Sequence, residues 1–270
     1  MITNMKIIIN NIRPTLLVLA AITAAPAAER HFAYAQESAV LAPGIAEVEL
    51  QATRKEGRKD HWVRQESRLE VEFGLAEGLM GALYLNHQQV TKAVDGTTDD
   101  LTSSTVQGIS GELKYQFSDP VADPLGSAAY VEVTGETDAV EYEFKAILDK
   151  QVGPVLFAAN AIYEIELAQE TAAEKVREVK YGGILSAVHT VGPRTRVGLE
   201  TDWRNVRTDE GIDSAIFGGP VIHYQGGKYW LTAAVLPQLA GLRHHDDAES
   251  GRNLSEFHRW EARVLLGVDF

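Results

Sequence analysis

The sequence has no cysteine among its 270 residues and is short of basic side chains. Without thiols the chain can form neither disulfide bonds nor a thiolate metal site, and it has no thiol nucleophile. Its 25 Lys and Arg residues against 38 Asp and Glu residues give a formal net charge of -13. Because an acidic surface repels the phosphate backbone, nucleic acid is excluded as a partner.

Long apolar runs are also missing after the first 25 residues, which excludes a membrane protein built from helices. At the N-terminus, Lys6 and Arg13 precede an apolar run over 15–25 and then a series of small residues. This order is typical of a cleavable secretory signal peptide. We expect residues 1–35 to be the signal peptide, cleaved after Ala33-Tyr34-Ala35. Cleavage at Ala25-Pro26-Ala27 is the alternative.

Residues 36–270 contain no internal repeat or low-complexity linker, which indicates a single domain. Alternation of apolar and polar residues predicts an all-β chain, with strands at 45–55, 62–74, 79–90, 105–117, 127–134, 139–152, 155–168, 176–190, 195–206, 214–224, 229–239 and 257–270. Twelve strands suit an antiparallel up-and-down transmembrane β-barrel, in which an even number is the rule. Gly218-Gly219-Pro220 and Pro237 weaken the tenth and eleventh strands, so ten is the alternative count.

The last strand alternates from Phe257 to the terminal Phe270, and a bare terminal aromatic resembles the signal that the assembly machinery of Gram-negative outer membranes reads. We expect this strand to pair with the first one, near 45–55. Short connections such as 153–154 alternate with longer ones such as 91–104, an asymmetry typical of outer-membrane barrels. A soluble barrel or sandwich would show the same alternation, but export, long strands and Phe270 favour the membrane.

Charged residues gather on one face of the predicted strands and hardly occur on the other. Because polar side chains of a membrane barrel point inward, we expect them to line the lumen. The candidates are Arg64, Glu66, Arg68, Glu70, Glu141, Glu143, Lys145, Glu164, Glu166, Arg196, Glu200, Asp202, Arg259, Glu261 and Arg263. Acids outnumber bases on this face, which favours cations if the lumen conducts. The alternative is that the charges pair across strands and close the interior.

Signals for enzyme chemistry are weak. A lipid hydrolase would need a serine beside a histidine such as His87, and no serine stands two residues after it. His244 and His245, followed by two aspartates, could bind a divalent cation, but a short polar run in a loop is usually solvated surface. The sequence therefore predicts no catalytic residue and no cofactor.

Two blocks carry a resemblance to a known family. They are Phe217 to Gln238, and Lys114-Tyr115-Gln116 followed by Asp123-Pro124-Leu125-Gly126 and Tyr130-Val131-Glu132. They resemble a family of uncharacterised Gram-negative outer-membrane barrels, and more loosely porin-like and transporter-like barrels. The resemblance implies a fold and a compartment, and it transfers no active site.

These observations together predict an exported outer-membrane barrel that acts as a passive, mildly cation-favouring channel for small solutes. A non-conducting structural or surface-interaction barrel is the second hypothesis, and a lipid hydrolase is the third. The expected partners are outer-membrane lipid, lipopolysaccharide and, through Phe270, the assembly machinery. The sequence leaves the oligomeric state open.

Overall fold

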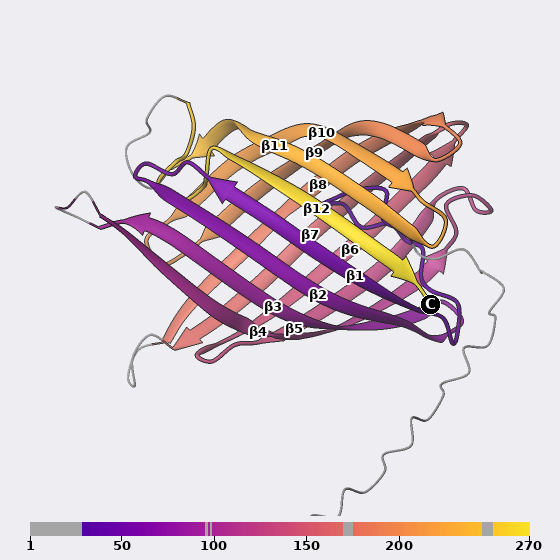
Figure 1. The fold of residues 1–270 in the computed structure, drawn as a ribbon, viewed down its shortest axis with the longest axis horizontal. Coiled ribbons are helices and arrows are strands. Elements are labelled where there is room, and N and C mark those ends of the chain that lie inside the picture. The colour runs from indigo at the N-terminus through magenta and orange to yellow at the C-terminus, as the bar shows by residue number, and fades with distance from the viewer. Residues whose placement is uncertain (1–28, 95–96, 98, 170–174, 245–250) are drawn as a thin grey trace, which may run out of the picture.

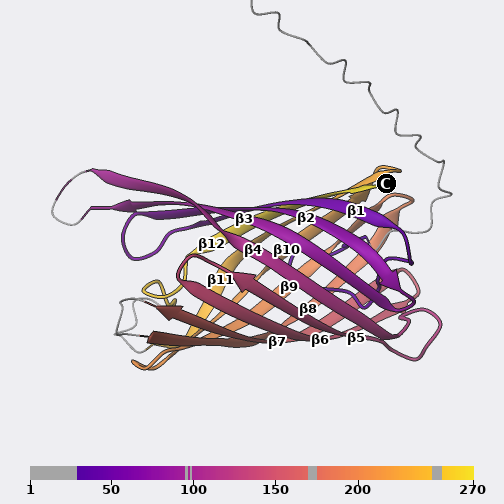
Figure 2. The same ribbon diagram turned by 90° about the horizontal axis from the view of Figure 1, so that it is seen from below.

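The computed structural model describes residues 29–94, 97, 99–169, 175–244 and 251–270. Twelve antiparallel strands form one closed barrel, in which every strand pairs with its sequence neighbours and the first pairs with the last (Figures 1 and 2). The strands are β1 (Ala46–Glu56), β2 (Trp62–Ala76), β3 (Leu79–Ala93), β4 (Asp100–Ser118), β5 (Gly126–Gly135), β6 (Ala139–Val152), β7 (Val155–Gln169), β8 (Lys175–Gly192), β9 (Thr195–Arg207), β10 (Ile212–Gln225), β11 (Tyr229–Arg243) and β12 (Trp260–Asp269). The predicted all-β, up-and-down fold is confirmed. Among the described residues, no helix is both long and apolar enough to cross a membrane.

The strand count is twelve rather than ten because β10 tolerates its proline. Pro220 pairs with Leu199 of β9, whereas the ladder to β11 is interrupted between Phe217 and Val221. A residue without an N–H therefore lies where β10 has only one partner strand. Both doubtful strands keep their place in the barrel.

β1 and β12 close the barrel, as the predicted pairing of the last strand with the first requires. Their pairing runs from Glu47 opposite Asp269 to Glu56 opposite Trp260, and the Phe270 N–H donates to the Ala46 carbonyl at 3.3 Å. The last strand begins at Trp260, not at 257 as expected, because the buried Phe257 precedes it in the connecting loop. Alternation alone did not reveal where the chain enters the ladder.

The two rims differ less than the sequence suggests. One end, which we call the turn rim, carries the connections 77–78, 119–125, 153–154, 193–194 and 226–228 together with Phe270 (Figure 1). At the other end, the loop rim, β3 and β4 extend as a ribbon that stands out from the barrel (Figure 2). Only 94–99 connects them, and Thr91 and Thr102 share a hydroxyl hydrogen bond of 3.0 Å across the ribbon. The long loop expected over 91–104 is therefore mostly strand.

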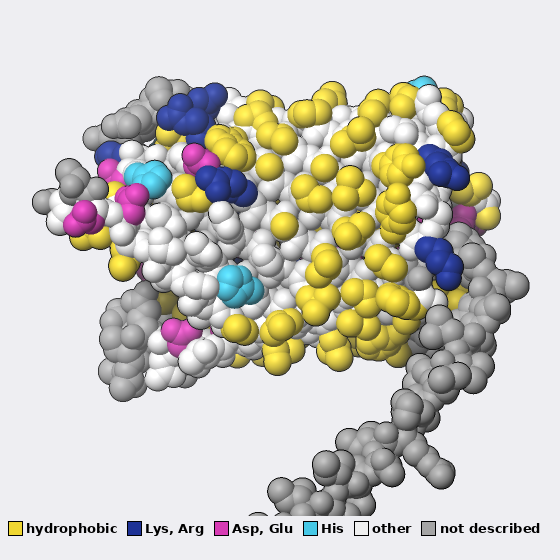
Figure 3. Space-filling view, viewed as in Figure 1, with side chains coloured by type: hydrophobic (Ala, Val, Ile, Leu, Met, Phe, Trp, Pro, Cys, Tyr) yellow, Lys and Arg dark blue, Asp and Glu magenta, His cyan; other side chains and the backbone are white. Residues whose placement is uncertain are grey.

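An apolar belt surrounds the barrel. Figure 3 shows apolar side chains over the middle of the outer surface and charged ones near its ends. The belt contains large exposed residues from most strands, among them Leu50, Leu69, Leu83, Leu113, Leu148, Leu185, Leu199, Leu231 and Val264. Exposed aromatics, including Tyr115, Phe117, Phe157, Tyr229 and Phe270, lie toward the turn rim. This distribution is the one that a bilayer requires of a barrel's outer face.

The closure predicts where a covalent bridge can form in a chain that has no native thiol. Ala52 of β1 and Val264 of β12 are direct partners, so their Cβ atoms lie within the range that a disulfide spans. We expect the double variant Ala52→Cys/Val264→Cys to oxidise to a bridge, seen as loss of both free thiols and of two hydrogens in the intact mass. The pair Ala52→Cys/Val268→Cys is four residues out of register and should keep its thiols; bridging of this control pair alone would contradict the closure.

Candidate functional site: the lumen and its N-terminal plug

An irregular segment before β1, residues 29–41, folds back inside the barrel near the turn rim, and we call it the N-terminal plug (Figure 1). Phe32, Ala33 and Ala35 are fully buried, and Tyr34 keeps only 6% of its surface exposed. Sequence reasoning missed the plug because its small residues match a cleavage site. No local pattern could identify the side chains that bind its backbone, Glu200, Asn160 and Asp149, which lie more than a hundred residues further along the chain.

Glu200 of β9 is the main anchor of the plug. Its carboxylate accepts hydrogen bonds from the backbone N–H groups of Ala33, Tyr34 and Ala35 at 3.0, 3.0 and 3.1 Å. An irregular segment has no ladder to satisfy its buried N–H groups, so a charged acceptor that takes three of them stabilises its position strongly. Glu200 was predicted to line the lumen, and inside the barrel it is covered by the plug.

Two further side chains bind the C-terminal half of the plug, at Gln36 and Ser38. Asn160 of β7 accepts a hydrogen bond from the Gln36 N–H at 2.6 Å and donates one to the Gln36 carbonyl at 2.9 Å. Asp149 of β6 accepts from the Ser38 N–H at 3.0 Å. The plug is thus held by side chains of several strands and not by a strand ladder.

Apolar packing completes the contact between plug and barrel. Phe32 to Ala35 share one buried cluster with inward residues of β7 to β11 and of the last loop: Leu156, Ala158, Ile184, Val188, Val206, Ala215, Phe217, Val221, Ala234, Leu236 and Phe257. This cluster explains why β10 and β11 alternate poorly, because one of their faces meets the plug and the other belongs to the apolar belt. Both faces are therefore apolar.

Two arginines cover the ring of Tyr34 on the side away from the turn rim. The guanidinium carbons of Arg263 and Arg204 lie 4.1 and 5.9 Å from the ring centroid. Arg263 also donates a hydrogen bond to the Ala33 carbonyl at 3.3 Å. These cation–π contacts place charge directly on the inner surface of the plug.

Beyond the plug, toward the loop rim, the lumen is a polar cavity of about 420 Å³ that is open to solvent, which we call the vestibule. Tyr34 and Gln36 of the plug belong to its wall. Ten of the fifteen predicted lumen residues line it: Arg64, Glu66, Arg68, Glu141, Glu143, Lys145, Glu164, Asp202, Glu261 and Arg263. At the loop rim, burial raises the pKa of Glu136, which belongs to the same wall.

The other five predicted residues lie elsewhere. Glu70 and Glu200 are buried, the first opposite Glu49 in the strand ladder and the second under the plug. Glu166 contacts Lys180 at 3.3 Å. Arg196 of β9 lies opposite His223 of β10 in the strand ladder, near the turn rim. Arg259 is exposed and precedes β12, so it is outside the strand that was expected to turn it inward.

Acids gather around one lysine, Lys180, which lines the vestibule together with Glu141 and Glu164, while Glu166 and Glu178 contact it from outside the lining. The Lys180 ammonium lies 3.6, 2.5, 3.3 and 3.4 Å from carboxylate oxygens of Glu141, Glu164, Glu166 and Glu178. Glu141, Glu164 and Glu166 come close enough together to suggest a cation site, but the ammonium already sits among them. Four formal negative charges against one positive charge leave this wall acidic.

Bases are more frequent on the opposite wall, formed by β1, β2 and β12. Lys55 and Arg64 both contact Glu66, at 2.9 and 2.7 Å, so one carboxylate serves two cations. Arg263 donates to the Thr53 hydroxyl at 2.9 Å. Since β1 and β7 are six places apart in a ring of twelve, the acidic and basic walls face each other across the vestibule.

The structure places the histidines that the sequence suggested for a hydrolase and for a loop metal site. His87 Nε2 lies 2.9 Å from the hydroxyl of Ser104 on β4. The spacing of the two residues along the sequence did not predict this cross-strand contact. A hydrolase would need a third group to orient the imidazole. Among the contacts of the described residues, no carboxylate or amide reaches the His87 ring. In the suggested loop metal site, His244 is described, whereas His245 and the two aspartates after it lie outside the described residues.

The fold and the lumen define a class: a closed twelve-stranded β-barrel with an N-terminal segment in its interior. The chain belongs to a family of unknown function, DUF6662, which it matches over residues 24–270. No curated protein matches the sequence. The expected resemblance to an uncharacterised barrel family is therefore confirmed.

Solved structures with the same fold include channels. The chain is similar to the COG4313 outer membrane channel from Pseudomonas putida F1, with a TM-score of 0.63 and 11% identity over 86% of this chain and 98% of that one. The NanC porin follows with 0.54 and 12%, over 83% and 98% of the two chains. The β domain of the Bordetella autotransporter BrkA gives 0.51 and 12%, over 84% and 100%. At these identities the likeness concerns the fold.

The three hydrogen bonds to Glu200 predict that this residue controls docking of the plug. Each hydrogen bond to a charged acceptor contributes about 1.5 to 3 kcal/mol, so Glu200→Ala should increase amide exchange at 33–35 by about thirtyfold or more. Hydrogen–deuterium exchange with mass spectrometry measures this directly. Glu166→Ala, which removes a lumen acid that contacts Lys180 and not the plug, is the control. Equal exchange in both variants would contradict the anchoring role.

Proposed function

We propose that this protein is an outer-membrane channel for small solutes and that the N-terminal plug closes its periplasmic mouth. The observation that carries the proposal is the vestibule, a polar cavity that runs from the loop rim to the plug. The plug is held by side-chain contacts that can break without opening the strand ladder. Displacing it would extend the aqueous path through the barrel.

The apolar belt supports a location in the outer membrane. An arginine or lysine at the midplane of the lipid-facing surface costs about 2 to 4 kcal/mol, and the belt is built from leucine, valine and aromatic side chains instead. Likeness in fold to a protein described as an outer membrane channel, and to a porin, agrees with this. In this orientation the turn rim is periplasmic. Lipid and lipopolysaccharide contact the belt, and Phe270, which is 62% exposed, is available to the assembly machinery.

We also propose a mild preference for cations. Within the vestibule, acids and bases are close to balance, so the preference comes from the uncompensated carboxylates around Lys180. The facing acidic and basic walls would additionally orient a solute that carries both charges.

The plug requires a particular start of the exported chain. Cleavage after Ala35 would remove Phe32 to Ala35, whose backbone and side chains fill the lumen. We therefore propose that the signal peptide ends near Ala25-Pro26-Ala27, the alternative site, and that the single barrel domain begins there. The family match from residue 24 agrees with this boundary.

Conduction tests the channel proposal. In planar bilayers, Glu200→Ala should raise the open fraction of the reconstituted barrel by about tenfold or more over the unchanged protein, because the plug loses its main anchor. Glu166→Ala should leave the open fraction near that of the unchanged protein. The reversal potential in a salt gradient measures the preference for cations over anions in the same recording.

Silence of folded protein in both variants would contradict the channel and favour the non-conducting scaffold. Heat-modifiable migration in gels establishes that the silent protein is folded, so that loss of the barrel is not mistaken for a closed lumen.

Processing of the N-terminus tests the boundary. The intact mass of protein extracted from membranes should correspond to a first residue before Glu29. Ala27→Leu should block processing, because the residue at the cleavage point must be small. Ala35→Leu should leave processing unchanged. A mature chain that begins at Gln36 would contradict the proposed boundary.

A further inference from the structure

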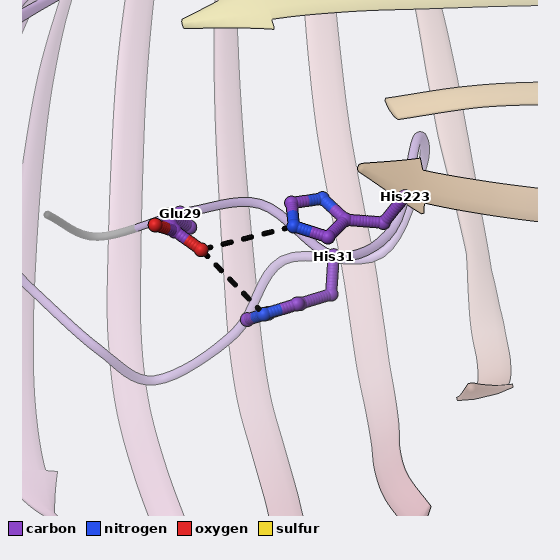
Figure 4. Close-up of side chains that lie close together, drawn as sticks. All are labelled: Glu29, His31 and His223. Carbon is purple, nitrogen blue, oxygen red and sulfur yellow. Dashed lines mark ion pairs between the residues drawn. The ribbon is translucent and has the colours of Figure 1, made fainter. Parts of the chain in front are cut away.

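Three metal-ligating side chains meet where the plug enters the barrel. Glu29 and His31 come from the plug and His223 from β10 (Figure 4). The Glu29 Oε2 atom lies 3.9 Å from His31 Nε2 and 3.7 Å from His223 Nε2. All three ligand atoms are within 4.8 Å of one another, and His223 is only 2% exposed.

The spacing suits a small transition-metal ion. Two imidazoles and one carboxylate form one of the usual protein ligand sets for zinc, which binds them at about 2.0 to 2.2 Å in a tetrahedron. Ligand atoms in such a tetrahedron are about 3.4 Å apart. The two separations from the carboxylate, 3.7 and 3.9 Å, therefore require a contraction of only a few tenths of an ångström, and the two imidazole nitrogens lie within 4.8 Å of each other.

Hydrogen bonds fix the orientation of both imidazoles. Thr232 donates its single hydroxyl hydrogen to the Arg30 carbonyl at 2.5 Å, so its oxygen is free to accept from His223 Nδ1 at 2.8 Å. His31 Nδ1 lies 2.6 Å from a Glu37 carboxylate oxygen, which can only accept. In neutral imidazoles, both arrangements leave the Nε2 lone pair directed at the common centre.

The carboxylate is oriented in the same manner. Glu29 Oε1 accepts a hydrogen bond from the Gln225 amide, which leaves Oε2 facing the two imidazoles. Three acceptor atoms thus converge at separations too long for a hydrogen bond between them. Each ligand also has an outer partner, as the ligands of metal sites usually do. A cation at the centre would satisfy all three acceptors at once.

We propose that Glu29, His31 and His223 bind a divalent transition-metal ion of the zinc type, with a water in the fourth position. Because two ligands belong to the plug and one to the barrel wall, the bound ion fastens the plug to β10. Ion binding and plug docking are then linked, and each stabilises the other. The effect on conduction rests on the proposed channel function, whereas binding of the ion does not.

Calorimetry with zinc chloride tests the binding. It uses the tag-free protein in detergent, after removal of the signal peptide and with no further truncation. We expect one ion per chain, with at least about tenfold weaker affinity in His31→Ala and in Glu29→Gln. Glu29→Gln keeps the size of the side chain, so it serves where loss of the buried His223 would unfold the protein. His61→Ala, at the loop rim beside Asp100, is the matched control and should bind as the unchanged chain does.

A second readout is independent of affinity. Zinc should slow amide exchange at 29–35 in the unchanged protein and in His61→Ala, and not in Glu29→Gln. Thr232→Val removes the acceptor for His223 Nδ1 and should weaken zinc binding by about tenfold or more. Absence of zinc binding to folded protein, binding that survives both Glu29→Gln and His31→Ala, or a mature chain that lacks Glu29 would overturn the site.

The two proposals fail separately. Zinc that binds as expected while Glu200→Ala stays silent in bilayers would keep the metal site and remove the channel. Conduction by Glu200→Ala without zinc binding would keep the channel and remove the metal site. If both the channel and the metal site are supported, zinc added on the periplasmic side should lower the open fraction of the unchanged protein and leave that of Glu29→Gln unaffected.

Discussion

The pairing of β1 with β12 is the constraint on which the rest of the molecule depends. Once this ladder is closed, each described strand pairs on both sides within the barrel wall, where it has one face toward the surroundings and one toward the lumen. The outer face is apolar around the whole barrel. The inner face is divided: β7 to β11 pack apolar side chains on the plug, and the charged residues farther toward the loop rim surround the vestibule.

Much of this fold could be predicted because alternation fixes which face a side chain takes. Ten of the fifteen predicted lumen residues line the vestibule for that reason, and the alternation up to Phe270 also indicated that the last strand pairs with the first. Alternation does not show where a strand leaves the barrel. β3 and β4 continue past the expected loop because residues such as Thr91 and Thr102 stabilise a ribbon that is polar on both sides.

The plug could not be predicted, and the reason is physical. Its stability comes from side chains that bind an irregular backbone, such as Glu200 with Ala33 to Ala35, and such contacts have no period along the sequence. The residues around Ala35 also fit a cleavage motif, which concealed them. For the same reason, the sequence did not connect Glu29 and His31 with His223. A histidine in a predicted signal peptide is not expected to contact the barrel wall.

The position of the plug in the chain has a consequence for the order of assembly. The plug precedes every strand in the chain, yet apart from the ion pair between Arg30 and Glu49 most of its contacts are made with β6 to β12, more than a hundred residues later. Contacts of such large sequence separation form late, because the intervening chain must be ordered before they can be made. We therefore expect the plug, although it precedes β1, to dock last, so that the interior of the barrel stays unobstructed until the final strands are in place.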